Sequence, residues 1–315
     1  MTGVDAGAFV PLAVTTRSGF RESVHAGAAV GLAADGSVAV AFGDPYVTIF
    51  PRSSNKPLQA EAMLALGWRA TDEQLALACA SHAGTPRHLA VVESTLAAAG
   101  LTATDLGNTP SLPLDSAATE AVLRGGGAAS PLLQNCSGKH AAMLATCVVN
   151  GWDRADYLAT EHPLQRAITE RFASQTGQPG ADAVFVGIDG CGAPTHATPL
   201  VGLAASYARL ATAHAATWRA MTAWPDLVDG DGRTVTRLMQ AVPGLMAKAG
   251  AEGVFAAALP DGRTAAVKIA DGTSRAVGLV IAEVLRRLGV DVDPAAFAEP
   301  VLGHGVPVGT TDLLV

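Results

Sequence analysis

Residues 28–42 read AAVGLAADGSVAVAF, and residues 254–269 read VFAAALPDGRTAAVKI. In each stretch an Asp-Gly pair, Asp35-Gly36 or Asp261-Gly262, separates two runs of small and apolar residues. Asp-Gly strongly favours a tight two-residue turn, so each stretch is predicted to form a β-hairpin. The hairpins lie towards opposite ends of the chain. We expect them to join in one antiparallel sheet, which would bury the apolar runs of both.

The sequence between the hairpins is mainly helical in its pattern. Thr71 with Gln74 forms a predicted capping box, and Thr85-Pro86 is typical of a helix start. Further helices are expected over 57–66, 137–149, 163–174, most of 198–238 and 274–288. The last of these helices is expected to cover the sheet. Short strands are expected over 46–50 and 183–188, the second of them buried. Strands at both ends and helices between them favour an α+β fold over a doubly wound parallel sheet. We predict one domain over 1–315, with a sheet subregion (about 20–50 and 250–315) and a helical subregion (about 57–245).

Composition excludes several classes of protein. Apolar residues make up 49% of the chain and charged residues 16%, which is the balance of a globular protein rather than a disordered one. The net charge of −7 comes with no basic stripe, so no nucleic-acid partner is expected. No apolar run is long enough to span a bilayer, and the N-terminal stretch lacks the pattern of a signal peptide. We therefore expect no membrane partner and a cytoplasmic location.

Lysine is rare in this chain. Only four of the 21 Lys and Arg residues are lysines, namely Lys56, Lys139, Lys248 and Lys268. Arginine serves equally well as a surface charge, but it cannot give up its proton, whereas a lysine amine can. The lysines are therefore enriched candidates for chemistry, and the alternative is that four residues are too few to interpret.

The segment RSSNKP at 52–57 contains Ser53 and Lys56 at the S-x-x-K spacing, at a predicted helix start. One helical turn separates the two residues, so the hydroxyl and the amine lie on one face. A neutral amine in that position can accept the serine proton and so generate a nucleophile.

Two further segments are open to more than one interpretation. Ser81 and His82, in CASHAG at 79–84, are either catalytic or a plain C-terminal helix cap and a surface residue. Lys268, in KIADG at 268–272, either takes part in the chemistry of the site or is a charge that protects an edge strand from aggregation.

The cysteines divide into two pairs. Cys79 and Cys147 are expected to be small buried apolar residues, and no disulfide framework is expected. Cys136 lies in NCSGKH at 135–140 and Cys191 in GIDGCGAP at 187–194. Two thiolates can bind a soft divalent ion, with Zn²⁺ the default, but without a C-x-x-C motif simple burial stays an alternative.

These motifs, in this order from Arg52 to Gly272, resemble the rhizobial-type, or class 3, zinc-containing L-asparaginases, which are related in fold to serine β-lactamases and glutaminases. The resemblance implies two Ser–Lys pairs, Ser53 with Lys56 and Ser81 with Lys268. It implies a Zn²⁺ site made by Cys136, Lys139, Cys191 and water. It also implies that Arg52, His140 and Asp189 orient the substrate, and that the protein is a homodimer.

The expected function is the hydrolysis of L-asparagine to L-aspartate and ammonia through a serine acyl-enzyme. Two alternative enzymes are a penicillin-recognising acyl-serine hydrolase, which the expected cytoplasmic location disfavours, and a glutaminase. A third alternative is a non-catalytic asparagine sensor.

Overall fold

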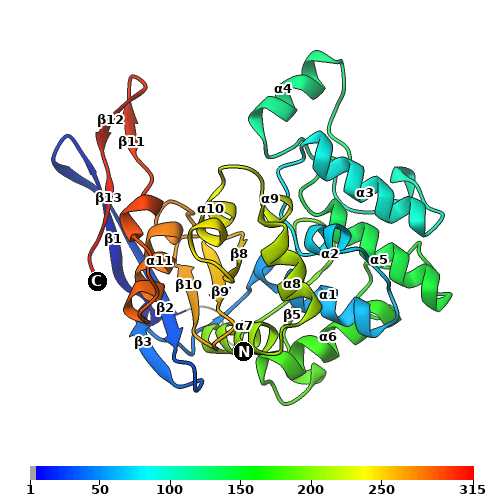
Figure 1. Cartoon of the computed structure of the whole chain (residues 1–315), viewed down its shortest axis with the longest axis horizontal. Coiled ribbons are helices and arrows are strands. Elements are labelled where there is room, and N and C mark those ends of the chain that lie inside the picture. Colours follow the sequence, from blue (N-terminus) through cyan, green and yellow to red (C-terminus); the bar gives the residue numbers. More distant parts are fainter. Residues whose placement is uncertain (1–4) are drawn as a thin grey trace. The chain divides into compact units, whose positions relative to one another are not determined.

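The structure, a computed structural model, describes residues 5–315, which divide into two compact units (Figure 1). Unit 1 comprises the described part of Met1–Ser54 together with Ala197–His214 and Leu238–Val315. Unit 2 comprises Asn55–His196 and Ala215–Arg237. The assignment of the whole chain to one domain stays a prediction. Residues 197–214, which the sequence placed in the helical subregion, belong to unit 1.

Unit 1 is built on an antiparallel sheet that contains both predicted hairpins. β2 (Phe20–Leu32) is followed by β3 (Val38–Phe42), which pairs with it, and β9 (Val254–Ala258) pairs with β10 (Thr264–Ile269). β2 and β10 are themselves paired, with Ala29 opposite Val267. Gly36 and Gly262 have φ of 84° and 98°, a conformation that glycine adopts without steric cost. The prediction that both hairpins lie in one antiparallel sheet is therefore confirmed.

The sheet extends on both sides of these hairpins. Among residues 5–315 the strand order is β13-β1-β2-β10-β9-β8, with β3 paired to β2. The additional strands are β1 (Val10–Arg17), β8 (Met246–Gly250) and β13 (Thr311–Leu313). β10 thus lies inside the sheet, so the interpretation of Lys268 as an edge-strand residue was wrong. The turns after β1 and β8 have only the weaker signals Ser18-Gly19 and Glu252-Gly253, and these strands were not predicted from them.

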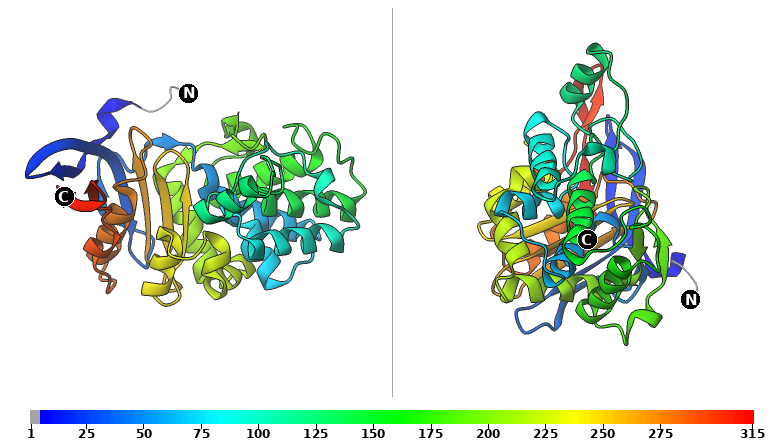
Figure 2. Two further views of the ribbon diagram at one scale, coloured as in Figure 1. Left: turned by 90° about the horizontal axis from the view of Figure 1, so that it is seen from above. Right: turned by 90° about the vertical axis from the view of Figure 1, so that its right-hand side faces the viewer.

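Two helices cover the central strands of this sheet. α7 (Leu200–Thr212) and α11 (Val277–Arg287) both pack against β2, β9 and β10, and Figures 1 and 2 show α11 alongside the sheet. Every residue of β9 and β10 is buried, so both faces of these strands are covered. A Cβ on Gly31 would lie 2.9 Å from Val284, which shows how closely α11 approaches β2. The predicted covering role of the last helix is confirmed.

Unit 2 is a helical assembly around α5 (Ser137–Asn150), which is buried without interruption from Ser137 to Cys147. A helix that is apolar on all sides is expected at the centre of a bundle. α1 (Lys56–Ala65), α2 (Asp72–Ala78), α3 (Pro86–Ala98) and α6 (Pro163–Thr176) pack against it. The unit also contains α4 (Ser116–Arg124), α8 (Ala216–Ala223) and α9 (Pro225–Val228). The Thr71–Gln74 capping box at the start of α2 is present as predicted. α10 (Thr234–Ala241) crosses from unit 2 into unit 1 after Arg237.

Two short strands differ from their prediction because each pairs outside the main sheet. The strand expected over 46–50 is reduced to β4 (Thr48–Ile49), which pairs with β7 (Thr198–Pro199). The strand expected over 183–188 begins only at β5 (Val186–Ile188), which forms a hairpin with β6 (Pro194–His196). Ile188 is 82% exposed, so the prediction of a buried strand was wrong.

The remaining elements are short. They are the hairpin of β11 (Val301–Gly303) with β12 (Val306–Gly309) and the 3-10 helices η1 (Ala6–Ala8), η2 (Arg52–Asn55), η3 (Ala103–Asp105), η4 (Ala181–Ala183) and η5 (Pro294–Phe297). Within residues 5–315, no helix combines the length and the apolar character needed to cross a bilayer.

Candidate active site

The S-x-x-K segment begins with a strained residue. Arg52, the first residue of η2, has φ of 52°, in the left-handed region that is unfavourable for side chains larger than glycine. Such a conformation costs roughly 1–3 kcal/mol and is concentrated at functional sites. Ser53 follows directly and is half-buried. The unit boundary falls after Ser54, so Ser53 belongs to unit 1 and Lys56 to unit 2.

Lys56 is 1% exposed and lies beside a serine other than its predicted partner. Its Nζ donates a hydrogen bond to the carbonyl of Ala80 and a second, of 3.2 Å, to Oγ of Ser81. The backbone N–H of Ser81 is held by the carbonyl of Val228 at 3.0 Å. The structure therefore brings Lys56 and Ser81 together within unit 2. The predicted Ser53–Lys56 and Ser81–Lys268 pairs each join residues of different units and stay predictions.

All four lysines are buried, at 1%, 2%, 0% and 8% exposure for Lys56, Lys139, Lys248 and Lys268. Lysine is almost never buried unless its charge is compensated, so burial at all four positions is consistent with the interpretation of this rare residue as chemical. Lys248, on β8, lies in none of the motifs, and rarity was its only signal. Its Nζ donates to the carbonyl of Ala249 at 2.6 Å, and its own carbonyl accepts from Oγ of Ser54 at 3.0 Å.

Glu252 is a residue of unit 1 that the sequence motifs missed. It lies in the turn between β8 and β9 with φ of 59°, and its backbone carbonyl accepts a hydrogen bond from Lys268. Its carboxylate lies 3.7 Å from Nη1 of Arg52. Burial lowers the pKa of Lys268, and the negative charges of Glu252 and Asp271 partly oppose that effect. The only sequence signal was the Glu252-Gly253 turn between two apolar runs.

The three predicted zinc ligands lie together in unit 2. Cys136 immediately precedes α5, Lys139 lies in its first turn, and Cys191 lies in the β5–β6 turn, where Gly192 has φ of 89°. Nζ of Lys139 lies 3.2 Å from Sγ of Cys191, and Cys136 packs against Cys191 and Ala193. Two segments about 50 residues apart are thus joined at one point, which sequence spacing alone left undecided.

The electrostatics of this cluster favour a thiolate at Cys136 and a protonated thiol at Cys191. The neighbouring Cys191, followed by the cations of Lys56 and Lys139, holds the pKa of Cys136 well below its usual value. The hydrogen bond with Cys136, followed by burial, raises the pKa of Cys191. Burial opposes the charge on Lys139, but Cys191, Cys136 and Asp189 together raise its pKa.

These residues fit the group that the resemblance implies. The two sulfurs are ligands that suit Zn²⁺, and the buried Lys139 amine is an unusual third ligand that binds only when neutral, so metal binding must overcome its raised pKa. No group of three or more His, Cys, Asp or Glu residues suited to a metal lies within residues 5–315. The predicted set contains only two residues of those types and adds a lysine, so it is a different kind of site.

The other two cysteines behave as small buried residues. All four cysteines are buried free thiols in the structure. Burial raises the pKa of Cys147 to about 11, so this thiol stays protonated.

His140 is fully buried in α5, one residue after Lys139. Its Nδ1 shares a hydrogen bond of 2.7 Å with the hydroxyl of Tyr157, and its Nε2 has no hydrogen-bond partner. Burial lowers the pKa of His140 to about 4, and the Lys139 charge acts in the same direction while Cys191 opposes it. Asp189 is half-buried in the turn that carries Cys191, where its carboxylate accepts the N–H of Gly190 at 2.7 Å.

His82 is a structural link rather than a surface cap. It is fully buried, its Nε2 lies 2.9 Å from Oγ of Ser137, and its backbone N–H donates to the carbonyl of Asn135 at 3.2 Å. Burial, together with His88 and Lys56, lowers its pKa well below the usual value. His82 therefore joins the Ser81 segment to the start of α5, and the plain surface interpretation was wrong.

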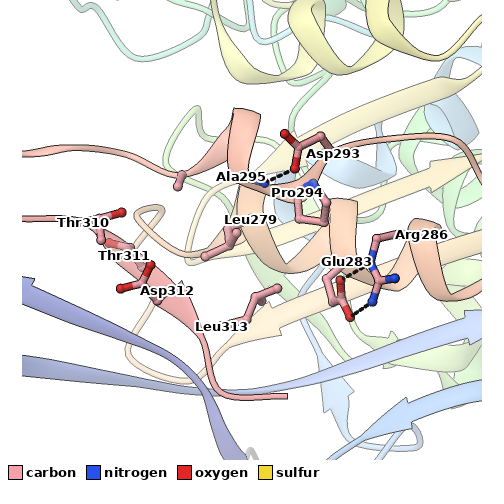
Figure 3. A pocket seen from close by; sticks show the side chains of 11 residues that line it. Leu279, Glu283, Arg286, Asp293, Pro294, Ala295, Thr310, Thr311, Asp312 and Leu313 are labelled. Atoms are coloured by element: carbon pink, nitrogen blue, oxygen red, sulfur yellow. Dashed lines mark hydrogen bonds and ion pairs between the residues drawn. The ribbon is translucent and has the colours of Figure 1, made fainter.

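A cavity of about 450 Å³ in unit 1 lies apart from these residues. Figure 3 shows it between α11, η5 and β13, where Glu283 is paired with Arg286. None of the predicted site residues lines this cavity.

The buried Lys56 amine is hydrogen-bonded to the Ser81 hydroxyl, an arrangement that an acyl-transferring hydrolase can use. The sequence matches the family described as L-asparaginase II over residues 13–313, so the chain belongs to that family. Membership supports an enzyme of the asparaginase type, an amidohydrolase that acts on a small molecule. No curated protein matched the sequence. Among solved structures the chain is similar to a beta-lactamase from Mycobacterium bovis, with a TM-score of 0.41 and 15% identity over 83% of this chain and 94% of that one.

Proposed function

We propose that this protein hydrolyses L-asparagine to L-aspartate and ammonia through a covalent serine ester. The observation that carries the proposal is the buried Lys56 amine, 3.2 Å from the hydroxyl of Ser81 and three residues after Ser53, in a chain of the L-asparaginase II family. A buried amine next to hydroxyl groups can accept a proton from one of them.

In the proposed reaction Ser53 transfers its proton to Lys56 as its oxygen attacks the side-chain amide carbon. The C–N bond then breaks, and the nitrogen leaves as ammonia after taking a proton. Water hydrolyses the aspartyl ester, which regenerates the serine. Ser81, hydrogen-bonded to Lys56, is the alternative nucleophile.

The remaining residues would bind and orient the substrate. Arg52 offers a guanidinium to the α-carboxylate, and Asp189 a carboxylate to the α-amino group. Cys136, Lys139 and Cys191 would hold Zn²⁺, which when bound supplies positive charge and rigidity to the pocket.

An ammonia-release assay on the purified protein tests this proposal. L-asparagine, L-glutamine and short amides are the substrates, and nitrocefin is the probe for penicillin-recognising activity. Ammonia from asparagine, with no turnover of nitrocefin, is the expected result. Asparagine binding without ammonia release would favour the sensor, and faster release from glutamine would favour the glutaminase. The cytoplasmic location and the homodimer stay predictions, which cell fractionation and analytical ultracentrifugation would check.

A further inference from the structure

The hydroxyl of Tyr157 is buried between the backbone N–H of Gly107 and a ring nitrogen of His140. Tyr157 is 2% exposed, and Gly107, His140 and Tyr157 all lie in unit 2. The backbone N–H of Gly107 donates to the Tyr157 oxygen at 3.2 Å. On its other side, the same oxygen lies 2.7 Å from Nδ1 of His140.

This arrangement determines which ring nitrogen of His140 carries the proton. The backbone N–H of Gly107 can only donate, so the hydroxyl hydrogen of Tyr157 has Nδ1 of His140 as its acceptor. A nitrogen that accepts a hydrogen bond is unprotonated, and a neutral imidazole then carries its hydrogen on Nε2. The opposite tautomer would leave a buried hydroxyl hydrogen without an acceptor, which is costly.

The Nε2–H of His140 is left as a buried donor. Nε2 makes no well-aligned hydrogen bond among residues 5–315, although the ring is fully buried. The sulfur of Cys191 is a hydrogen-bond partner of the ring, and Nδ1 is engaged by Tyr157, so Nε2 faces the Cys136–Lys139–Cys191 cluster. A cysteine sulfur is only a weak acceptor, so this buried donor is expected to meet a stronger one in a bound ligand.

We propose that Tyr157 is a positioning residue that holds His140 in the Nε2–H tautomer, so that His140 donates a hydrogen bond to an anionic group of the ligand and does not act as a base. The identity of that group as the substrate α-carboxylate rests on the proposed function. The tautomer itself does not, because it follows from the two hydrogen bonds of the Tyr157 hydroxyl.

Nitrogen-15 NMR of the imidazole tests the proposal, since protonated and unprotonated ring nitrogens have widely separated shifts. The wild-type protein, labelled at histidine and assigned with His140→Gln, should show His140 protonated at Nε2 only. Tyr157→Phe keeps the ring and removes the hydroxyl, so the His140 signals should move towards a mixture of tautomers. Tyr46→Phe, at a tyrosine that is 64% exposed, is the matched control and should leave them unchanged.

A wild-type spectrum with protonated Nδ1 would overturn the proposal, as would an unaltered spectrum in Tyr157→Phe. The wild-type measurement decides the tautomer even if the variant fails to fold. In the ammonia assay, Tyr157→Phe should raise KM for asparagine about tenfold, the loss expected for one hydrogen bond to a charged group, and change kcat less. An inactive wild-type protein with the predicted tautomer would reject the proposed function and keep this inference.

Discussion

Replacing Lys56 by arginine is expected to abolish nearly all asparagine hydrolysis although the positive charge is kept. The amine is 1% exposed and hydrogen-bonded to Ala80 and Ser81, so it is held where a general base would act. A guanidinium can donate in the same place but cannot accept a proton.

The expected loss follows from the role of the amine. A positioned general base contributes about 100- to 10,000-fold in rate, or roughly 3–5 kcal/mol of transition-state stabilisation. Lys56→Arg also adds volume to a closed site, at a cost in folding stability of roughly 1–3 kcal/mol. Lys56→Met keeps the volume but leaves the Ala80 carbonyl without its donor, at a similar cost. The two variants should therefore show a similarly low kcat. Both should also be less stable, Lys56→Arg because of its added volume and Lys56→Met because of the unpaired Ala80 carbonyl.

Steady-state ammonia release, thermal denaturation and zinc content should be measured on both variants. Zinc content is needed because Lys56 also lies near Cys136. A folded Lys56→Arg protein that keeps wild-type zinc and more than a tenth of wild-type kcat would refute the general-base role.

Three further outcomes are expected. Ser53→Ala should lose nearly all activity. Ser54→Ala should keep most of its activity and lose about 1 kcal/mol of stability, because it removes the hydrogen bond from the Ser54 hydroxyl to the carbonyl of Lys248. Mass spectrometry after a rapid quench should locate the aspartyl adduct on Ser53, and an adduct on Ser81 would reassign the nucleophile. Elemental analysis should find about one Zn²⁺ per chain, in keeping with a single ligand set, which Cys136→Ser/Cys191→Ser loses and the control Cys147→Ala retains; zinc in the double variant would contradict the site. Burial lowers the pKa of His196 from 6.5 to about 4, so the unfolded chain binds a proton that the folded chain does not between these values, and stability should fall as the pH decreases from 6.5 to about 4. His196→Gln should flatten that slope in urea titrations and the exposed control His304→Asn should not; equal slopes in His196→Gln and wild type would reject this assignment.

Local signals in the sequence were sufficient for much of the fold. The Asp35-Gly36 and Asp261-Gly262 turns, and the Thr71–Gln74 capping box, depend on residues within a few positions of each other. Turn geometry and helix capping are settled by backbone conformation and short-range hydrogen bonds, which the same residues carry with them. The family of the chain was likewise accessible from its short motifs.

The position of each element in the fold was decided only by tertiary structure. β10 became an interior strand because β2 and β9 both pair with it, and its pairing with β2 joins segments that are far apart in the sequence. Likewise, the short strand β5 was placed outside the main sheet and left Ile188 exposed.

The partners of the site residues were also beyond the sequence. Lys56 meets Ser81 across 25 residues, and Lys139 meets Cys191 across 52. Their residue type and rarity indicated that these lysines are candidates for a catalytic or ligand role, because only lysine can supply a neutral amine. Their burial and their partners depend on long-range packing, as does the contact of Tyr157 with His140, since such contacts form only when distant segments fold against each other.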